Sequence, residues 1–500
     1  MRIVVAIART RRISRRLLEP CLLLALASAF LQAQAPDRSA PPRVGPPPEL
    51  RLPPLQHRRL SNALPVVLLE KHQVPVVEID VVVKAGSALD PAGMAGLASM
   101  TAAMMDEGAG SMDALQLADA IDFLGARVSV SAGLHQTVVS LSTPLSKLDD
   151  ALPLLADVLL RPTFPARELD RERKNRLTTL LQWHDDPSAI ASTLLRRVLY
   201  RRDHPYGVSS IGDEQSLKRF RVEDLRRFHE ISFTSNNAEI IVVGDVDAAV
   251  LPKLEKAFGQ WKPGAAATAG KLPEIKQVTR REVYLVDRPG SAQSEIQIGR
   301  IGVQRLSQDY YAIEVMNTVL GGSFTSRLNQ NLREKHGFSY GAGSYFDYRP
   351  LPGPFVALSA VQTAVTDKAL VEIMKELSAI RKPLGEQELD RAKNYTALGF
   401  PAGFQSVAQV AARVEELVTY DLPDTYFNDY VGRILAVTGA DVERVARKYV
   451  DPSKVAIVVV GDLKEIEAEV RALNLGLVHR MTIDDVLGKA PVVDDTAPRE

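Results

Sequence analysis

The sequence predicts an α+β protein of two homologous domains, each a mixed or antiparallel sheet with helices packed on it. Short β-branched runs alternate with amphipathic helical patterns along the chain after residue 58, as in layered folds of this class. The run IIVVGDV at 240–246 returns as AIVVVGDL at 456–463, and the elements around both runs follow the same order. Solenoid units are only ~20–50 residues long, so a repeat of this length indicates a duplicated domain.

The first domain is expected at residues 58–263. Two β-branched runs in 64–86, separated by KHQVP, predict antiparallel strands. Apolar residues at helical spacing follow in 93–107, and DALQLADAIDFLG at 113–125 predicts a second helix that ends at a glycine. The remaining expected elements are strands in 127–143, helices at 145–160, 166–183, 187–201 and 221–231, and a strand in 236–247.

The second domain is expected at residues 277–480, after a small-residue, non-periodic linker at 264–276. The same plan returns there, and each copy is expected to bury its own helices on its own sheet. Strands are predicted in 281–287, 294–303, 338–348, 353–361 and 454–466, and helices at 308–320, 366–381, 386–398, 404–419 and 439–449. Residues 481–500 carry no readable motif and are expected to be a flexible, acidic tail.

The amino terminus predicts an exported, periplasmic protein. Residues 1–35 hold six arginines, a short apolar run CLLLALASAFL and small residues beyond it, which is the pattern of a signal peptide. A retained amphipathic anchor is the alternative. Residues 36–57 are proline-rich and predict an extended linker. No later run approaches the ~20 apolar residues of a membrane helix, so no span is expected after signal removal.

Composition excludes several classes of function. Lysine and arginine number 61 and aspartate and glutamate 61, so the net charge is +0 and no basic field for nucleic acid is expected. The single cysteine, Cys21, lies inside the predicted signal. A mature chain would therefore have no disulfide, thiolate metal ligand or thiol nucleophile.

Several motifs resemble one peptidase family. They are AGSALDPAGMAGLASMTAAMMDEGAG (85–110), HPYGVSSIGDEQSLKRFRVEDLRRFH (204–229), NNAEIIVVGDVD (236–247), GGSFTSRLNQNLREKHGFSYGAGSYF (321–346) and the second VVVGDL. In this order they resemble the pitrilysin/insulinase family of zinc metallopeptidases, in its short-chain branch with the mitochondrial processing peptidases and their bacterial relatives. The resemblance covers about 58–475 and implies a chain that forms half of a clam-shell chamber.

The resemblance also implies a zinc motif, H-x-x-E-H, on the helix that starts near residue 96. Its histidines would fall on Ser99 and Ala103, its general base on Ala102, and a distal glutamate ligand near Thr179. A neutral hydroxyl or a methyl group supplies no zinc ligand, and alanine cannot activate water. No metal or other cofactor is therefore expected in this chain.

The rest of the sequence offers no convincing replacement for the missing metal site. None of the eight histidines lies three or four residues from another, so no helix offers a bis-histidine face. Three clusters of acidic residues could bind a cation, but a structural role is the favoured interpretation for each. Asp106 and Glu107 are expected at a helix end, and Glu168 and Glu172 in a lattice of salt bridges. His184, Asp185 and Asp186 are expected at a polar helix end. A serine mechanism at Ser99 is disfavoured because GLASM lacks the second glycine of G-x-S-x-G.

Three residues are expected to face a substrate. The resemblance implies that Arg333 and Tyr340, spaced as in LREKHGFSY, hold a peptide backbone, and both side chains can donate hydrogen bonds to a carbonyl. It also implies that extended peptide adds to the edge strand at about Arg127–Gly133, where Ser129 stands in place of a frequent asparagine.

The sequence therefore predicts a non-catalytic subunit of an exported heterodimeric zinc peptidase. A homologous partner would carry the zinc, and the ligands would be extended peptides or unfolded protein segments. Two alternatives stay open: a stand-alone chaperone-like peptide-binding protein, and a structural scaffold of the same fold.

Overall fold

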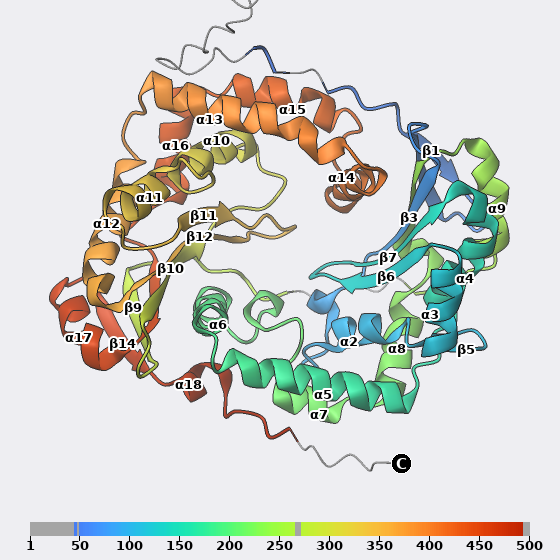
Figure 1. Cartoon of the computed structure of the whole chain (residues 1–500), viewed down its shortest axis with the longest axis horizontal. Helices are drawn as coiled ribbons and strands as arrows, with labels where there is room; N and C mark the ends of the chain where they lie inside the picture. The colour runs from blue at the N-terminus through green and yellow to red at the C-terminus, as the bar shows by residue number, and fades with distance from the viewer. Residues whose placement is uncertain (1–44, 48–49, 266–271, 494–500) are drawn as a thin grey trace, which may run out of the picture. The chain divides into compact units, whose positions relative to one another are not determined.

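The computed structural model describes residues 45–47, 50–265 and 272–493 (Figure 1). The predicted signal peptide and half of the proline-rich linker (36–44 and 48–49) lie outside these residues, and so does the middle of the predicted linker at 264–276. In the described part of the chain, no helix is both long enough and apolar enough to cross a lipid bilayer.

The first half forms a six-stranded sheet in the order β1-β2-β8-β3-β7-β6. Only β2 and β8 pair in parallel, and every other neighbouring pair is antiparallel. The strands are β1 (Gln56–Arg59), β2 (Pro65–Glu70), β3 (Val76–Val83), β6 (Arg127–Ala132), β7 (Thr137–Pro144) and β8 (Ala238–Gly244), while β4 (Gly108–Ala109) and β5 (Met112–Asp113) form a separate small ribbon.

The second half forms a sheet in the order β11-β12-β10-β13-β9-β14. Its strands are β9 (Glu282–Asp287), β10 (Gln293–Ile301), β11 (Ala342–Phe346), β12 (Pro354–Gln362), β13 (Ala456–Gly461) and β14 (Leu477–Met481). Taken in chain order, β9 to β13 occupy the same places as β2, β3, β6, β7 and β8. The predicted duplication and the α+β class are confirmed.

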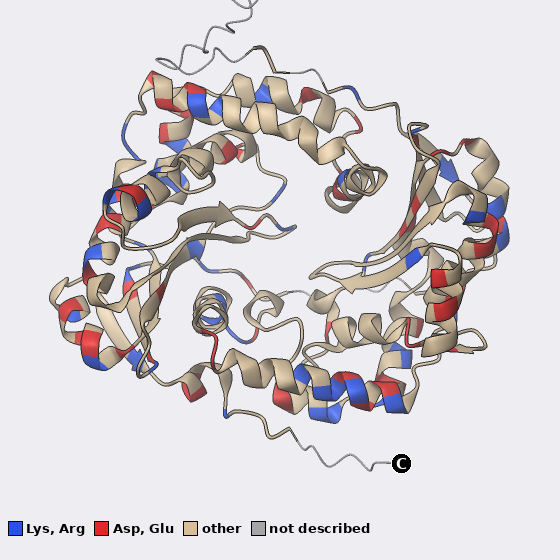
Figure 2. Cartoon of the chain, viewed as in Figure 1, with Lys and Arg blue, Asp and Glu red and all other residues tan. Residues whose placement is uncertain are grey.

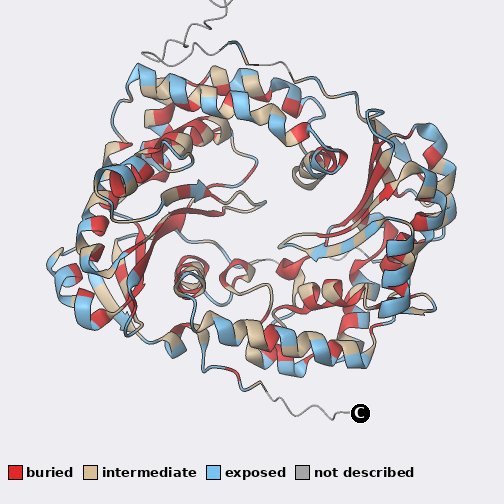
Figure 3. Cartoon of the chain, in the orientation of Figure 1, coloured by how far each residue is buried: buried red, intermediate tan, exposed pale blue. Residues whose placement is uncertain are grey.

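The two strands predicted in 64–86 run antiparallel, as expected, but they do not pair with each other. The two runs in 64–86 form β2 and β3, but β8 lies between them, parallel to β2 and antiparallel to β3. β8 is buried along nearly its whole length, and a strand that is apolar on both sides belongs in the centre of a sheet (Figure 3). The last strand of this half, β8, therefore lies between β2 and β3 in the sheet.

Helices of the first half cover one face of their sheet. The predicted helix at 93–107 is shorter than expected, because α2 begins after a left-handed Gly96 and ends at Met104. The helices are α2 (Leu97–Met104), α3 (Ala114–Phe123), α4 (Leu148–Leu160), α5 (Ala166–Trp183), α6 (Pro187–Tyr200), α7 (Glu214–Arg219), α8 (Val222–Ser232) and α9 (Leu251–Phe258).

The second half repeats this arrangement, but four of its helices, α11, α15, α17 and α18, lie where the sequence did not suggest a helix, and the predicted strand at 454–466 ends at Gly461, before α17. Its helices are α10 (Tyr310–Leu320), α11 (Arg327–Asn329), α12 (Thr366–Ala379), α13 (Glu386–Gly399), α14 (Val407–Tyr420), α15 (Tyr426–Leu435), α16 (Gly439–Tyr449), α17 (Leu463–Ala472) and α18 (Ile483–Leu487). A π-helical segment, Gln330–Lys335, continues α11.

Helix α6 does not pack on the sheet of its own half. Its apolar residues, among them Ile190 and Leu195, form one core with Val356 and Val458 of the second sheet (Figure 1). Gly299 on β10 leaves room for this contact, since a Cβ there would lie 2.9 Å from Leu195 Cδ2. The expectation that each copy covers its own sheet is therefore wrong for α6.

Helix α14 makes the reciprocal crossing. Val414 and Leu417 belong to one core with Val67 and Ile241 of the first sheet (Figure 1). α6 and α14 occupy equivalent places in the two halves, so the duplicated domains exchange equivalent helices. Each central strand thus has a helix from its own half on one face and a helix from the other half on the opposite face.

The predicted flexible tail is also wrong in its first part. Met481 ends β14, which pairs in parallel with β9, and α18 follows directly and packs on α6. Val486 of α18 is fully buried in the core that α6 forms. Burial of this one valine gives the segment a fixed place, and residues 494–500 lie outside the described part of the chain.

Three carboxyl groups meet where α14 crosses the first sheet. Glu78 and Asp80 of β3 are buried, and Glu415 of α14 accepts a hydrogen bond from Gln136 Nε2. Burial raises the pKa of Glu78 and of Glu415 to about 7, and it raises the pKa of Asp80 as well. The positive charge of Arg127 lowers the pKa of Glu78, but by less than burial raises it.

Replacing Leu195 by alanine should destabilise the second half although α6 belongs to the first. Loss of a buried leucine costs about 2–5 kcal/mol. Hydrogen exchange should become faster in β10 and β13, which lie under α6. Leu115→Ala, at a side chain that is 78% exposed, is the control. If hydrogen exchange became faster only in the first half, the packing of α6 on the second sheet would be contradicted.

The contribution of Glu78 and Glu415 to stability should fall as the pH rises from 5 to 8. The folded pKa values of Glu78 and Glu415 lie above their unfolded values, so their contribution is complete below about pH 4.5 and disappears as the pH passes about 7. Urea titrations should show Glu415→Gln with a flatter pH profile, its decline reduced by about 1 kcal/mol once screening is discounted. Glu386→Gln, an exposed acid on α13, should keep the wild-type slope.

Candidate functional site

The amino-terminal end of α2 is held by a buried carboxylate. Asp90 accepts hydrogen bonds from the backbone N–H groups of Gly96 (2.7 Å) and Ala98 (2.8 Å). Burial raises the pKa of Asp90 to about 7. Gly96 itself has φ +90°, and a Cβ there would lie 2.6 Å from the nitrogen of Gly212. Only glycine allows α2 to start this close to the loop at 208–213.

The structure places all four predicted metal positions on α2 and α5. Ala102 is buried in the core, and Ser99 and Ala103 are partly buried on the side of α2 that bears the motif. Thr179 lies on α5, where its hydroxyl donates to the backbone carbonyl of Asn175 (3.1 Å).

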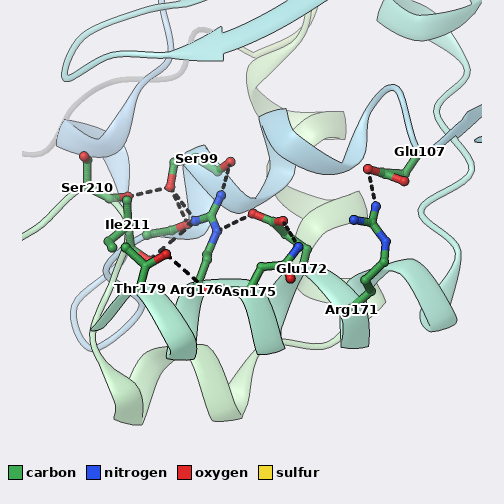
Figure 4. A network of polar contacts seen from close by, with 10 residues as sticks. Ser99, Glu107, Arg171, Glu172, Asn175, Arg176, Thr179, Ser210 and Ile211 are labelled. Atoms are coloured by element: carbon green, nitrogen blue, oxygen red, sulfur yellow. Dashed lines mark hydrogen bonds and ion pairs between the residues drawn. The ribbon is translucent and has the colours of Figure 1, made fainter. Parts of the chain in front are cut away.

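Arg176, one helical turn before Thr179, occupies the space between the two helices (Figure 4). Its side chain is buried, with 8% of the residue exposed. Nη1 donates to Ser99 Oγ (2.8 Å), Nη2 donates to the Ser99 carbonyl (2.8 Å), and Nε donates to Glu172 Oε1 (2.9 Å). A guanidinium group of this chain is thus bound to Ser99, one of the four positions at which the sequence predicted a vacant metal site.

Ser99 joins a third element to the pair. Its hydroxyl oxygen lies 2.5 Å from the Ser210 carbonyl and 3.1 Å from the Gly96 carbonyl, so it donates into the loop at 208–213 or into its own helix (Figure 4). The hydroxyl hydrogen is engaged in that bond, and the oxygen accepts from Arg176.

These residues do not fit a zinc ion. Zinc requires imidazole, thiolate or carboxylate ligands, and the four positions supply one serine, one threonine and two methyl groups. The Glu172 carboxylate is paired with Arg176, and Asp90 is occupied by the backbone N–H groups of Gly96 and Ala98. Within the described residues, no group of three histidine, cysteine, aspartate or glutamate side chains could hold a metal ion.

The alternative sites have structural roles. Glu107 pairs with Arg171 (2.5 Å), which also contacts Glu168, and α5 carries acids and bases along its exposed side (Figure 2). Asp186 caps α6 by accepting from Ser188 N at 2.9 Å. A salt-bridge lattice and a polar helix end, the two readings that the sequence favours, describe these groups.

Arg333 and Tyr340 lie on either side of the turn that leads into β11. Tyr340 is 92% exposed. The Arg333 guanidinium lies 4.6 Å from the ring centroid of Phe324, and its Nε is 3.4 Å from Glu334. No hydrogen bond or ring contact joins Arg333 to Tyr340 in the described residues, so the substrate-binding role of the pair stays a prediction.

The edge strand of the first sheet is open. β6 pairs only with β7, and Gly133 N donates to Gln136 O (2.7 Å) at the start of the hairpin. Because hydrogen-bonded pairs alternate along an antiparallel ladder, the backbone groups of Val128, Val130 and Ala132 point to the free edge. Ser129 lies between them, with its side chain exposed. Among the described residues, these outward groups have no backbone partner.

The equivalent edge of the second sheet is closed. On β11, Ser344 N donates to the Gly321 carbonyl (3.1 Å), and Asn317 Nδ2 donates to the Ser344 carbonyl (3.0 Å). Ala342 N donates to Asn329 Oδ1 at 3.3 Å. Gly321 is required here, since a Cβ would lie 2.2 Å from Ser344 N. Only one of the two duplicated edges is therefore available to an added strand.

Sequence reasoning missed Arg176, the residue that fills the site. The signal in the sequence was the spacing of four residues between Glu172 and Arg176, which allows an ion pair on one face of α5. In the structure, the other arginines of this helix are more exposed. Spacing on α5 alone cannot show that this arginine turns toward α2.

Comparisons with known proteins agree with this geometry. Two family models match the chain, "Insulinase (Peptidase family M16)" over residues 65–211 and "Peptidase M16 inactive domain" over residues 219–396. Together they cover more than half of the chain; the first lies within the first half, and the second begins at α8 of the first half and extends to α13 of the second.

The similar proteins include some that are named zinc proteases and one that is named a non-peptidase homolog. A "Non-peptidase homolog YmxG" of Helicobacter pylori is 25% identical over 349 residues, 68% of this chain and 79% of the relative. A "Zinc protease PqqE" of the same strain is 24% identical over 400 residues, 78% of this chain and 89% of the relative. The crystal structure of a peptidase M16 inactive domain from Pseudomonas fluorescens superposes with a TM-score of 0.76 at 27% identity and covers 81% of this chain and 97% of that one.

The matched models, the relatives and the duplicated fold lead to one conclusion: the chain belongs to peptidase family M16, the pitrilysin/insulinase family.

Proposed function

We propose that this chain is a non-catalytic, peptide-binding subunit of an exported heterodimeric zinc metallopeptidase. A homologous partner with an intact H-x-x-E-H helix would bind zinc and hydrolyse the peptide. The observation that carries the proposal is the absence of ligands: Ser99, Ala102, Ala103 and Thr179 offer no zinc ligand or base, and Ser99 is hydrogen-bonded to Arg176 of α5. This chain would line half of the chamber, with the partner lining the other half.

Peptide binding is supported by the open edge of β6. An extended segment can pair with the outward backbone groups of Val128, Val130 and Ala132, and such pairing does not depend on the side chain of Ser129. Tyr340 is free to donate to a peptide carbonyl because its hydroxyl has no partner among the described residues and the side chain is exposed. The bound class would be unfolded protein segments or extended peptides.

A heterodimer is supported by the two H. pylori relatives, because one strain holds both a chain named a non-peptidase and a chain named a zinc protease, each similar to this one. Export is supported by the signal-like sequence of residues 1–35.

The subunit role predicts how the purified chain behaves. Alone, it should bind no equimolar zinc and cleave no peptide. Combined with a zinc-bearing homologue recovered from its own organism, it should support cleavage of a quenched unstructured peptide. Arg333→Ala should then lower kcat, by up to ~10²–10³-fold if the guanidinium stabilises the oxyanion. Lys335→Ala, on the same π-helical segment, is the control. Equal turnover with wild-type and Arg333→Ala chains would sink this role, and peptide binding with no gain in cleavage when a zinc-bearing homologue is added would favour the chaperone-like alternative.

The strand-addition surface predicts a backbone-specific effect. Val130→Pro removes one outward N–H from an edge strand without removing a bond to β7, so the chain should still fold. Binding of a fluorescent unstructured peptide, measured by anisotropy, should weaken about tenfold, the equivalent of one or two lost hydrogen bonds. Ser129→Ala changes only a side chain and should leave the affinity nearly unchanged. The reverse order of effects would rule out pairing along β6.

A further inference from the structure

We propose that Arg176 is a built-in cation that takes the structural place of the metal: it ties α2 to α5 and to the loop at 208–213, and it keeps a divalent ion out. This inference concerns the chain alone and stands whether or not a zinc-bearing partner exists. It rests on the acceptors that converge on one guanidinium group and on the burial of that group.

The acceptors around Arg176 come from three separate elements. α2 supplies the carbonyl and hydroxyl oxygens of Ser99, and α5 supplies Glu172. The loop at 208–213 is joined through the Ser210 carbonyl, which receives the Ser99 hydroxyl, and the Ile211 carbonyl lies 3.5 Å from Nη1 (Figure 4). A metal ion also joins ligands from separate elements through one positive centre, so the topology of the tether is the same.

Arginine suits this place better than any other cationic side chain. Its planar group donates in several fixed directions at once, and here three different nitrogens reach three different oxygens at 2.8–2.9 Å. A lysine ammonium has no such fork. Because the group is buried, its removal would leave the Glu172 carboxylate and the Ser99 carbonyl without their donor.

The same geometry opposes metal binding. The guanidinium carries a positive charge between α2 and α5 and is hydrogen-bonded to Ser99, where a restored histidine would hold a metal, and like charges at short range in a poorly hydrated site repel strongly. Restored ligands on α2 and α5 would therefore meet a cation that is already bound to their helices. The site is closed as well as depleted of ligands.

The tether is tested by hydrogen exchange and thermal melting of single variants. Arg176→Met keeps the length of the side chain and removes its charge and donors. Backbone amides of α2 should exchange at least about tenfold faster, with a lower Tm, because hydrogen bonds between three elements are lost. Arg176→Lys should give an intermediate result and provides a folded variant if the methionine variant does not fold. Arg171→Met is the matched control, since Arg171 lies on the same helix and contacts Glu107 but is half-exposed. Identical exchange in Arg176→Met and Arg171→Met would overturn the tether.

The exclusion is tested by restoring the ligands in two backgrounds. The changes S99H, A102E, A103H and T179E are introduced with Arg176 retained and with Arg176→Ala, and folding is checked by circular dichroism. After dialysis against zinc, metal analysis should find near-equimolar zinc only in the Arg176→Ala background. Equal zinc in both backgrounds, or none in either, would overturn the claim that Arg176 keeps the ion out.

Discussion

Two sheets whose central strands are apolar on both sides must each be covered twice, and the structure depends on how this is done. β8 and β13 are almost entirely buried, and helices of the same half reach only one of their faces. The duplicated halves solve this by exchanging equivalent helices, α6 onto the second sheet and α14 onto the first. Neither half has a complete core without the other, so burial of apolar surface joins them, together with hydrogen bonds such as those from Gln136 to Glu415 and from Tyr200 to the Pro352 carbonyl.

This exchange also fixes the vacated metal position. α5 carries Glu172 and Arg176 and is followed within a few residues by α6, which is packed on the second sheet. α2 is held at its start by Asp90 and by its approach to Gly212. Both helices thus have their places set by burial, and Arg176 needs only to connect them. A family site that is built around a metal can lose that metal and keep its shape, because packing positions the helices.

The two halves differ where a ligand would bind. Both sheets end in an edge strand at the same place in the repeat, yet only β6 presents unpaired backbone groups. On β11, Asn317, Asn329 and the Gly321 carbonyl take up the outward groups. Closing the edge at β11 protects that sheet from non-specific pairing, whereas β6 keeps backbone groups to which an extended segment could add.

The sequence by itself determined the α+β class, the duplication, most helices and strands, and the absence of zinc ligands at Ser99, Ala102, Ala103 and Thr179. These follow from local periodicity and from residue chemistry, which need no knowledge of neighbours in space. Only the tertiary structure decided that β8 separates β2 from β3, that α6 and α14 cross between sheets, and that α18 packs on α6. It also decided that Arg176 turns inward to Ser99, 77 residues away in the chain. The sequence shows that an apolar helix face must be covered and that a buried arginine needs hydrogen-bond acceptors. Which residues cover the face or accept the bonds is decided only when distant segments of the chain fold together.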